Sequence, residues 1–143
     1  MKEVLHCLLI DDDADDQEIF LFALQQAFPD MACSIAFDCL EATKKLNSRE
    51  IPVPDYIFLD WMLPLMEAED CIRQLQLIPE LERTCTFILS GSEPFISAEN
   101  LRLLKIKKII RKQYDINELA RKIAEAILEV SYPDTDGEDQ GNC

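Results

Sequence analysis

The sequence predicts an α/β fold, a doubly wound parallel sheet of five strands with five helices. Five apolar runs of strand length alternate with segments in which apolar residues recur at helical spacing. The runs are almost continuously apolar, as expected for strands buried on both faces of a parallel sheet. Acidic residues follow two of these runs, at the edge where such sheets bind their ligands.

The predicted strands lie at residues 4–10, 31–37, 56–59, 84–89 and 106–110. The first helix carries an apolar stripe that includes Phe20 and Leu24. It should end near Phe28, because a residue before proline disfavours helical dihedrals and Pro29 follows.

Capping signals mark the start of the second and the last helix. Asp38 with Glu41, and Asp115 with Glu118, have the spacing of a capping box. The last helix then spaces its apolar residues along one face.

The third and fourth helices are predicted from proline and serine positions. The third follows a loop, turns its apolar stripe to the sheet and ends at Pro79. Ser92 and Pro94 are expected to form the cap and first turn of the fourth helix, which bears Ile96, Leu101 and Leu104.

Composition indicates one globular domain at residues 1–130 and an acidic, disordered tail at residues 131–143. The chain has 143 residues, of which 48% are hydrophobic, and a formal charge of −14. That charge argues against binding of nucleic acid or an anionic membrane, because either needs a basic face. No stretch approaches the roughly 20 apolar residues of a membrane span, and no signal-peptide pattern opens the chain, so we expect a cytoplasmic protein.

The cysteines show no C-x-x-C pair, and most stand among apolar neighbours. We therefore expect them to be reduced structural thiols. The set comprises Cys7, Cys33, Cys39, Cys71, Cys85 and Cys143.

Carboxylates gather at the ends of the first and third predicted strands. If these strands are neighbours, Asp11, Asp12 and Asp60 meet and form a site for Mg²⁺, or for Mn²⁺ in its place. The alternative is that residues 11–13 only form a turn in which Asp13 caps the first helix.

The fourth and fifth strands end at Ser90 and Lys112. A metal held by carboxylates, together with a hydroxyl and an ammonium, can cover the three oxygens of a transferring phosphoryl group. Asp60 would be the nucleophile, since a carboxylate needs no proton removed before it attacks. The strand ends therefore predict a site that handles phosphoryl groups.

From residue 4 to about residue 130 the chain resembles the receiver domain of two-component response regulators, in the form of a stand-alone, chemotaxis-regulator-like receiver. Four motifs carry the resemblance: LLIDDD at residues 8–13, FLDWMLP at 58–64, ILSG at 88–91 and IRK at 110–112. The resemblance implies a flavodoxin-like sheet with strand order 2-1-3-4-5.

The resemblance also implies a role for each site residue. Asp60 would accept a phosphoryl group from a sensor histidine kinase or a histidine phosphotransfer protein, as a phosphoacceptor that assists its own reactions and not as an enzyme. Asp12 would ligate Mg²⁺ directly, Asp11 through water and Met62 by its backbone carbonyl. In the phosphorylated form, Lys112 and Ser90 would each contact a phosphoryl oxygen, and the Ser90 contact would act as the switch.

Three positions depart from the family pattern. Gln113 stands in place of the usual proline after the lysine, so a trans peptide bond should replace the usual cis bond. Ala68 stands where a glycine is usual. Ile109 stands where many receivers have an aromatic switch residue, so rotation of a ring there cannot report phosphorylation.

Three other functions share parts of this pattern. A flavodoxin-like cofactor binder needs backbone amides of Gly, Ser or Thr to hold a phosphate, and the first loop here is acidic. A phosphatase with an aspartate nucleophile needs a second acid two residues after Asp60, where Met62 stands. A degenerate receiver that binds partners without phosphorylation stays open because of Gln113 and Ile109.

The output of a receiver would be binding of a downstream target protein or onward relay of the phosphoryl group, and the sequence does not choose between them. Five of the fourteen basic residues fall between residues 105 and 112. This cluster is either a docking surface for an acidic partner or a solvated edge.

Overall fold

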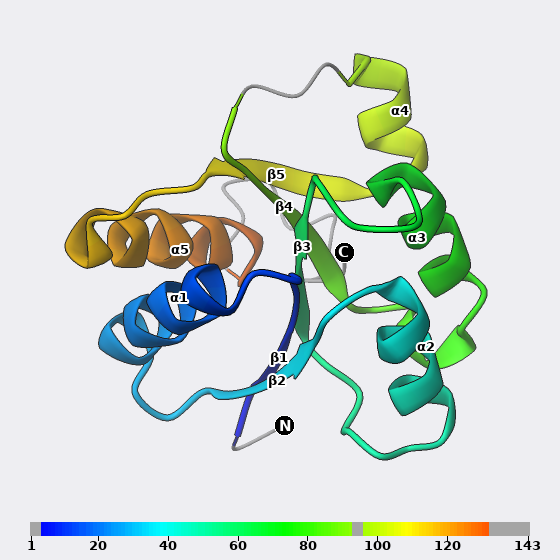
Figure 1. Ribbon diagram of the computed structural model, residues 1–143, viewed down its shortest axis with the longest axis horizontal. Coiled ribbons are helices and arrows are strands. Elements are labelled where there is room, and N and C mark those ends of the chain that lie inside the picture. Colours follow the sequence, from blue (N-terminus) through cyan, green and yellow to red (C-terminus); the bar gives the residue numbers. More distant parts are fainter. Residues whose placement is uncertain (1–3, 93–95, 132–143) are drawn as a thin grey trace.

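The computed structural model describes residues 4–92 and 96–131, which form one sheet of five parallel strands with helices on both faces (Figure 1). The strand order is β2-β1-β3-β4-β5, which confirms the predicted flavodoxin-like arrangement. In chain order the elements are β1 (His6–Ile10), α1 (Ala14–Ala27), β2 (Ala32–Ala36), α2 (Cys39–Asn47), β3 (Tyr56–Asp60), α3 (Ala68–Gln76), a 3₁₀ turn (Pro79–Leu81), β4 (Cys85–Ser90), α4 (Ala98–Leu103), β5 (Ile106–Arg111) and α5 (Ile116–Ser131).

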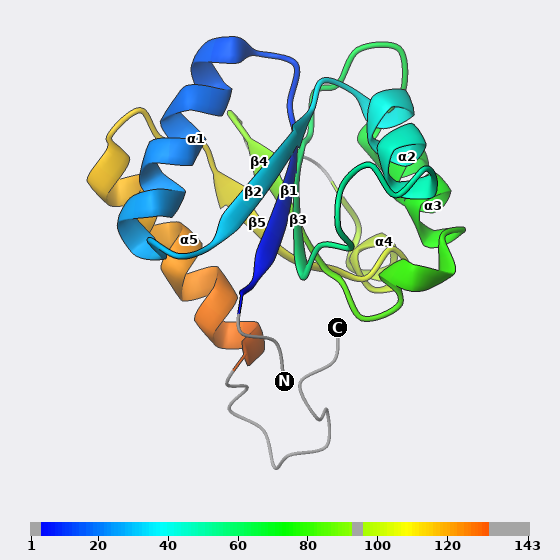
Figure 2. The same ribbon diagram turned by 90° about the horizontal axis from the view of Figure 1, so that it is seen from below.

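The sheet is covered by α1 and α5 on one face and by α2, α3 and α4 on the other (Figure 2). Alternate strand residues point to opposite faces, so Phe58 packs under α1 and α5 while Ile57 packs under the other three helices. The ring centroid of Phe58 lies 5.0 Å from that of Phe20 and 5.0 Å from that of Phe87. None of the described helices is long and apolar enough to cross a membrane.

Two predicted capping pairs are confirmed by hydrogen bonds. The Asp38 carboxylate accepts the backbone N–H of Glu41 at 2.8 Å, and the Asp115 carboxylate accepts that of Glu118 at 3.1 Å. Helix α1 ends at Ala27, as the proline at residue 29 predicts. Its N-cap is Asp13, so the turn-and-cap alternative describes the local structure of this residue correctly.

The prediction for the start of the fourth helix is wrong. Helix α4 begins at Ala98, and its N-cap is Ser97, whose hydroxyl accepts the backbone N–H of Asn100 at 3.0 Å. The backbone of Ser92 is instead hydrogen-bonded to the Ser90 hydroxyl in a local turn. Pro94 lies outside the described residues.

Helix α5 extends to Ser131, the first residue of the predicted tail. The Ser131 hydroxyl hydrogen-bonds the Tyr56 hydroxyl at 3.0 Å, which ties the end of the helix to β3. The rest of the predicted acidic tail, residues 132–143, lies outside the described residues.

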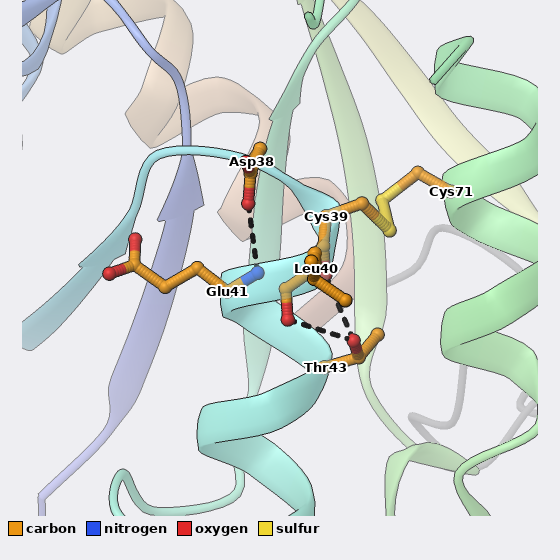
Figure 3. The surroundings of a disulfide bond; sticks show 6 residues. All are labelled: Asp38, Cys39, Leu40, Glu41, Thr43 and Cys71. Atoms are coloured by element: carbon orange, nitrogen blue, oxygen red, sulfur yellow. Dashed lines mark hydrogen bonds between the residues drawn. A yellow bond between two sulfur atoms is a disulfide. The ribbon is translucent and has the colours of Figure 1, made fainter. Parts of the chain in front are cut away.

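The expectation of reduced thiols is wrong for Cys39 and Cys71, which form a disulfide between the first residue of α2 and the second turn of α3 (Figure 3). Both side chains are buried, because the two helices pack on the same face of the sheet. Their separation of 32 residues hides the pairing from inspection of the sequence. The expectation is also wrong for Cys85, which is disulfide-bonded. Cys7 and Cys33 are free, as predicted, and Cys143 lies outside the described residues.

Reduction of the Cys39–Cys71 disulfide should lower the free energy of unfolding by about 3 to 4 kcal/mol, because the reduced unfolded chain regains the entropy of a long loop. Urea unfolding of the wild type with and without reductant measures the difference. The C39S/C71S variant is the control, since reductant should not act on this bond there. Equal unfolding free energies for the oxidised and reduced wild type would contradict the prediction.

Candidate functional site

Three carboxylates meet at the carboxyl ends of β1 and β3. Ile10 pairs with Leu59 in the parallel register, so the residues that follow them, Asp11 and Asp60, lie side by side. Oxygens of Asp11, Asp12 and Asp60 all lie within 4.8 Å of one another. Asp11 and Asp60 are buried, and Asp12 is exposed. The predicted convergence of these three residues is confirmed as geometry.

Local hydrogen bonds fix the buried carboxylates. One oxygen of Asp11 accepts the backbone N–H of Asp13 at 2.9 Å, and one oxygen of Asp60 accepts that of Met62 at 3.1 Å. The Gln17 side chain donates to the Asp11 carbonyl at 2.7 Å, so the first turn of α1 also holds the end of β1. The second oxygen of each buried carboxylate is therefore directed to other partners.

Those second oxygens face the ammonium of Lys112, which follows β5. The Lys112 Nζ lies 3.2 Å from Asp11 Oδ2 and 3.3 Å from Asp60 Oδ2. It lies still closer, at 2.7 Å, to Asp16 Oδ2 in the first turn of α1. Burial alone would lower the pKa of Lys112, but the hydrogen bond to Asp16 and the charges of Asp11 and Asp60 outweigh it and raise this pKa. Lys112 therefore stays charged.

The pKa of Asp11 is raised from 3.8 to about 6, mainly by burial and to a smaller extent by the neighbouring charge of Asp60. The N–H of Asp13 and the ammonium of Lys112 act in the opposite direction but do not cancel the increase. The ammonium of Lys112 thus does not fully offset the cost of burying Asp11 beside Asp60. The site favours a further positive charge.

The donor set fits a hard divalent cation. The candidate ligands are carboxylate oxygens, without a histidine or thiolate among them, which favours Mg²⁺ or Mn²⁺ over Zn²⁺. Met62 lies on the loop after β3 and is 74% exposed.

Ser90 is buried at the end of β4, and its hydroxyl is bound within its own loop. It donates to the Ser92 carbonyl and accepts the Ser92 N–H at 3.3 Å. The backbone N–H of Lys112 donates to the Ser90 carbonyl at 2.8 Å, so the two residues are neighbours through their backbones. The predicted serine thus lies at the correct edge of the sheet, with its hydroxyl turned to the loop.

The three positions that depart from the expected pattern lie as follows. No cis peptide bond occurs in the described residues, which agrees with the trans bond expected at Gln113. Ala68 is buried at the start of α3, and Ile109 is half-buried against the core under α2, α3 and α4.

Sequence analysis missed Asp16 and Gln17. Both lie in the first turns of α1, within six residues of Asp11, and both bind groups of the site. The signal in the sequence is the acidic pair Asp15 and Asp16, which follows the run of three acids. Residues four apart lie on the same side of a helix, so Asp16 is expected on the side of Asp12.

Asp11 should make the stability of the metal-free protein depend on pH. Its folded pKa, about 6, exceeds the ordinary value of 3.8, so the folded state holds this proton more tightly than the unfolded state. The resulting stability is present below pH 3.8 and is lost as the pH rises through about 6. In EDTA, the free energy of unfolding of D11N should therefore increase relative to that of the wild type across this interval.

Urea unfolding at the two ends of the interval measures this difference. The exposed Asp15 supplies the control, because D15N should show no such relative gain. A constant difference between the wild type and D11N at both pH values would contradict the assignment.

No family model matches the sequence, and no curated protein matches it. Solved structures do match. The phosphorylated cyanobacterial phytochrome response regulator RcpA is 22% identical with a TM-score of 0.72, and covers 87% of this chain and 91% of its own. The Mn²⁺-bound response regulator Rcp1 is 21% identical with a TM-score of 0.71, over 92% and 96% of the two chains.

A chemotaxis response regulator of Vibrio cholerae, CheY4, is 16% identical with a TM-score of 0.70, over 86% of this chain and 98% of its own. The matches therefore extend over nearly the whole length of each relative. The chain has the flavodoxin-like fold of the response regulator receiver domains.

Proposed function

We propose that this chain is a phosphorylation-dependent receiver whose phosphoacceptor is Asp60. The observation that carries the proposal is the position of the Asp60 carboxylate. It lies within 4.8 Å of two further carboxylates and 3.3 Å from the Lys112 ammonium, on a receiver fold. A carboxylate so placed is a ready nucleophile with a cation beside the position that a phosphoryl oxygen would take.

In this proposal Asp60 attacks the phosphorus of a phosphohistidine on a histidine kinase or phosphotransfer protein. A P–O bond to Asp60 forms as the P–N bond breaks, and the electron pair of that bond leaves with the donor's imidazole. Lys112 pairs with an oxygen of the transferred group. The chain is consumed as a phosphoacceptor and is not a conventional enzyme, although its own residues assist the transfer.

The proposed metal site comprises Asp60, Asp12 as a direct ligand, Asp11 through water and Met62 through its carbonyl. The metal, Mg²⁺ or Mn²⁺, supplies positive charge that offsets the negative charge of the phosphoryl group. Support comes from the all-oxygen donor set, from the raised pKa of Asp11 and from a relative whose structure is described as Mn²⁺-bound.

Ser90 supplies the proposed switch. Its hydroxyl now bonds to Ser92, and in the phosphorylated form it would turn to a phosphoryl oxygen. The loop between β4 and α4 would then lose this internal contact and change its shape. The output, target binding or relay, would follow from that change, in a cytoplasmic protein whose receiver unit is residues 1–130.

A second candidate is a receiver that binds partners without phosphorylation. It is favoured by Gln113 and Ile109, which differ from the usual residues beside the lysine. The two candidates differ in whether Asp60 becomes phosphorylated, and this can be tested.

Incubation with acetyl phosphate and Mg²⁺ should add one phosphate to the wild type, and hydroxylamine should remove it, because an acyl phosphate is labile to this nucleophile. D60N should gain no phosphate. D30N, which removes an exposed acid at the opposite end of α1, should react like the wild type. Intact-protein mass spectrometry measures all three.

A phosphate that persists in D60N would overturn the nucleophile assignment, and a wild type that stays unmodified would favour the second candidate.

The basic cluster offers a docking surface for an acidic partner. Lys107 is exposed at the irregular pairing between β4 and β5, and Lys108 forms an ion pair with Glu129 at 3.2 Å. Both lie in the strand that leads to Lys112. A charged surface there would mainly speed association of an acidic partner.

K107E/K108E should slow association with the kinase or phosphotransfer protein that phosphorylates this chain by about tenfold at low ionic strength, and the difference should shrink in high salt. K44E/K45E is a matched control on α2, since Lys44 is exposed and Lys45 pairs with Glu41. Association rates from surface plasmon resonance distinguish the two variants. Equal rates in both would show the cluster to be only a solvated edge.

A further inference from the structure

The shortest ion pair of the site is made by a residue outside the expected receiver set. Lys112 Nζ lies 2.7 Å from Asp16 Oδ2, compared with 3.2 Å for Asp11 and 3.3 Å for Asp60. Asp16 does not belong to the group of carboxylates that could share a metal ion. Its carboxylate therefore acts on the lysine and not on the metal.

Helix α1 holds Asp16 in place. The carboxylate of the N-cap residue Asp13 accepts the backbone N–H of Asp16 at 2.9 Å. The Asp16 side chain is 20% exposed and that of Lys112 is 18% exposed, so water screens this ion pair less than a surface pair. The ion pair is therefore partly buried, with Asp16 held by the start of α1.

An ammonium has three N–H donors, and three carboxylates lie around this one. A phosphoryl oxygen on Asp60 can be bound by Lys112 only if it shares or displaces one of these contacts. Asp16 also adds negative charge beside a position that must accept a negatively charged group. Both effects oppose the phosphorylated state.

We propose that Asp16 is a positioning residue that holds Lys112 on the α1 side of the site and competes with the phosphoryl group for its ammonium. This inference rests on the proposed phosphoacceptor function of Asp60. Asp16 thereby sets how readily the acceptor is loaded. In D16N the charge is removed, while Asp11 and Asp60 keep Lys112 in the site.

D16N should bind beryllofluoride, a tetrahedral mimic of a phosphoryl group, about three- to tenfold more tightly than the wild type in saturating Mg²⁺, because a partly buried charge no longer opposes it. Its phosphorylation by acetyl phosphate should be faster by a similar factor. Isothermal titration calorimetry and mass spectrometry measure the two effects.

D15N is the matched control, because it removes the same charge from an exposed position in the same helical turn. The D16N effect should also vanish in the K112M background, since Asp16 acts through the lysine. Circular dichroism confirms that each variant is folded.

The outcomes separate the two proposals. A wild type that is not phosphorylated at Asp60 would end the proposed function and this inference together. A wild type that is phosphorylated, with D16N equal to D15N or weaker than the wild type, would end this inference alone. An undiminished D16N effect in K112M would show that Asp16 acts by general charge and not by holding Lys112.

Discussion

The site depends on a balance of charge around the Lys112 ammonium. Parallel pairing of β1 with β3 brings Asp11 and Asp60 together, and the two buried carboxylates cannot move apart without breaking the sheet. Lys112 follows β5, with β4 between it and β3, so its long side chain must reach over the end of β4 to contact them. The pKa of Asp11 is raised, mainly by burial and also by the charge of Asp60, so this ammonium does not fully offset the cost of burying the two carboxylates.

This imbalance connects the fold to the proposed chemistry. In the proposed function, the excess negative charge would favour binding of a divalent cation, and the cation would in turn permit a phosphoryl group to approach Asp60. The groups that respond belong to different elements, since Ser90 ends β4 and Asp16 opens α1. Loading the acceptor would therefore change contacts on both sides of the sheet. The Cys39–Cys71 disulfide joins α2 to α3, so these two helices would stay together during such a change.

Sequence reasoning predicted what depends on local pattern and failed where tertiary contacts decide. The strands agree with the prediction to within a few residues, because buried parallel strands are continuously apolar. The carboxylates of residues 11, 12 and 60 lie together as predicted, because the carboxyl ends of parallel strands share one edge of the sheet. The start of α4 was missed because the Ser90 hydroxyl binds Ser92, which leaves Ser97 as the cap. The disulfide and the Asp16 contact were missed because distant residues form them.

The most direct test of the central claim is the free energy of unfolding as a function of Mg²⁺ concentration. A cation that binds only the folded cluster should stabilise it by about 2.7 kcal/mol when its concentration is a hundredfold above the dissociation constant. D12N, which removes an exposed carboxylate of the cluster, should lose most of this stabilisation. An unfolding free energy that does not respond to Mg²⁺, or that responds equally in D12N, would contradict the account.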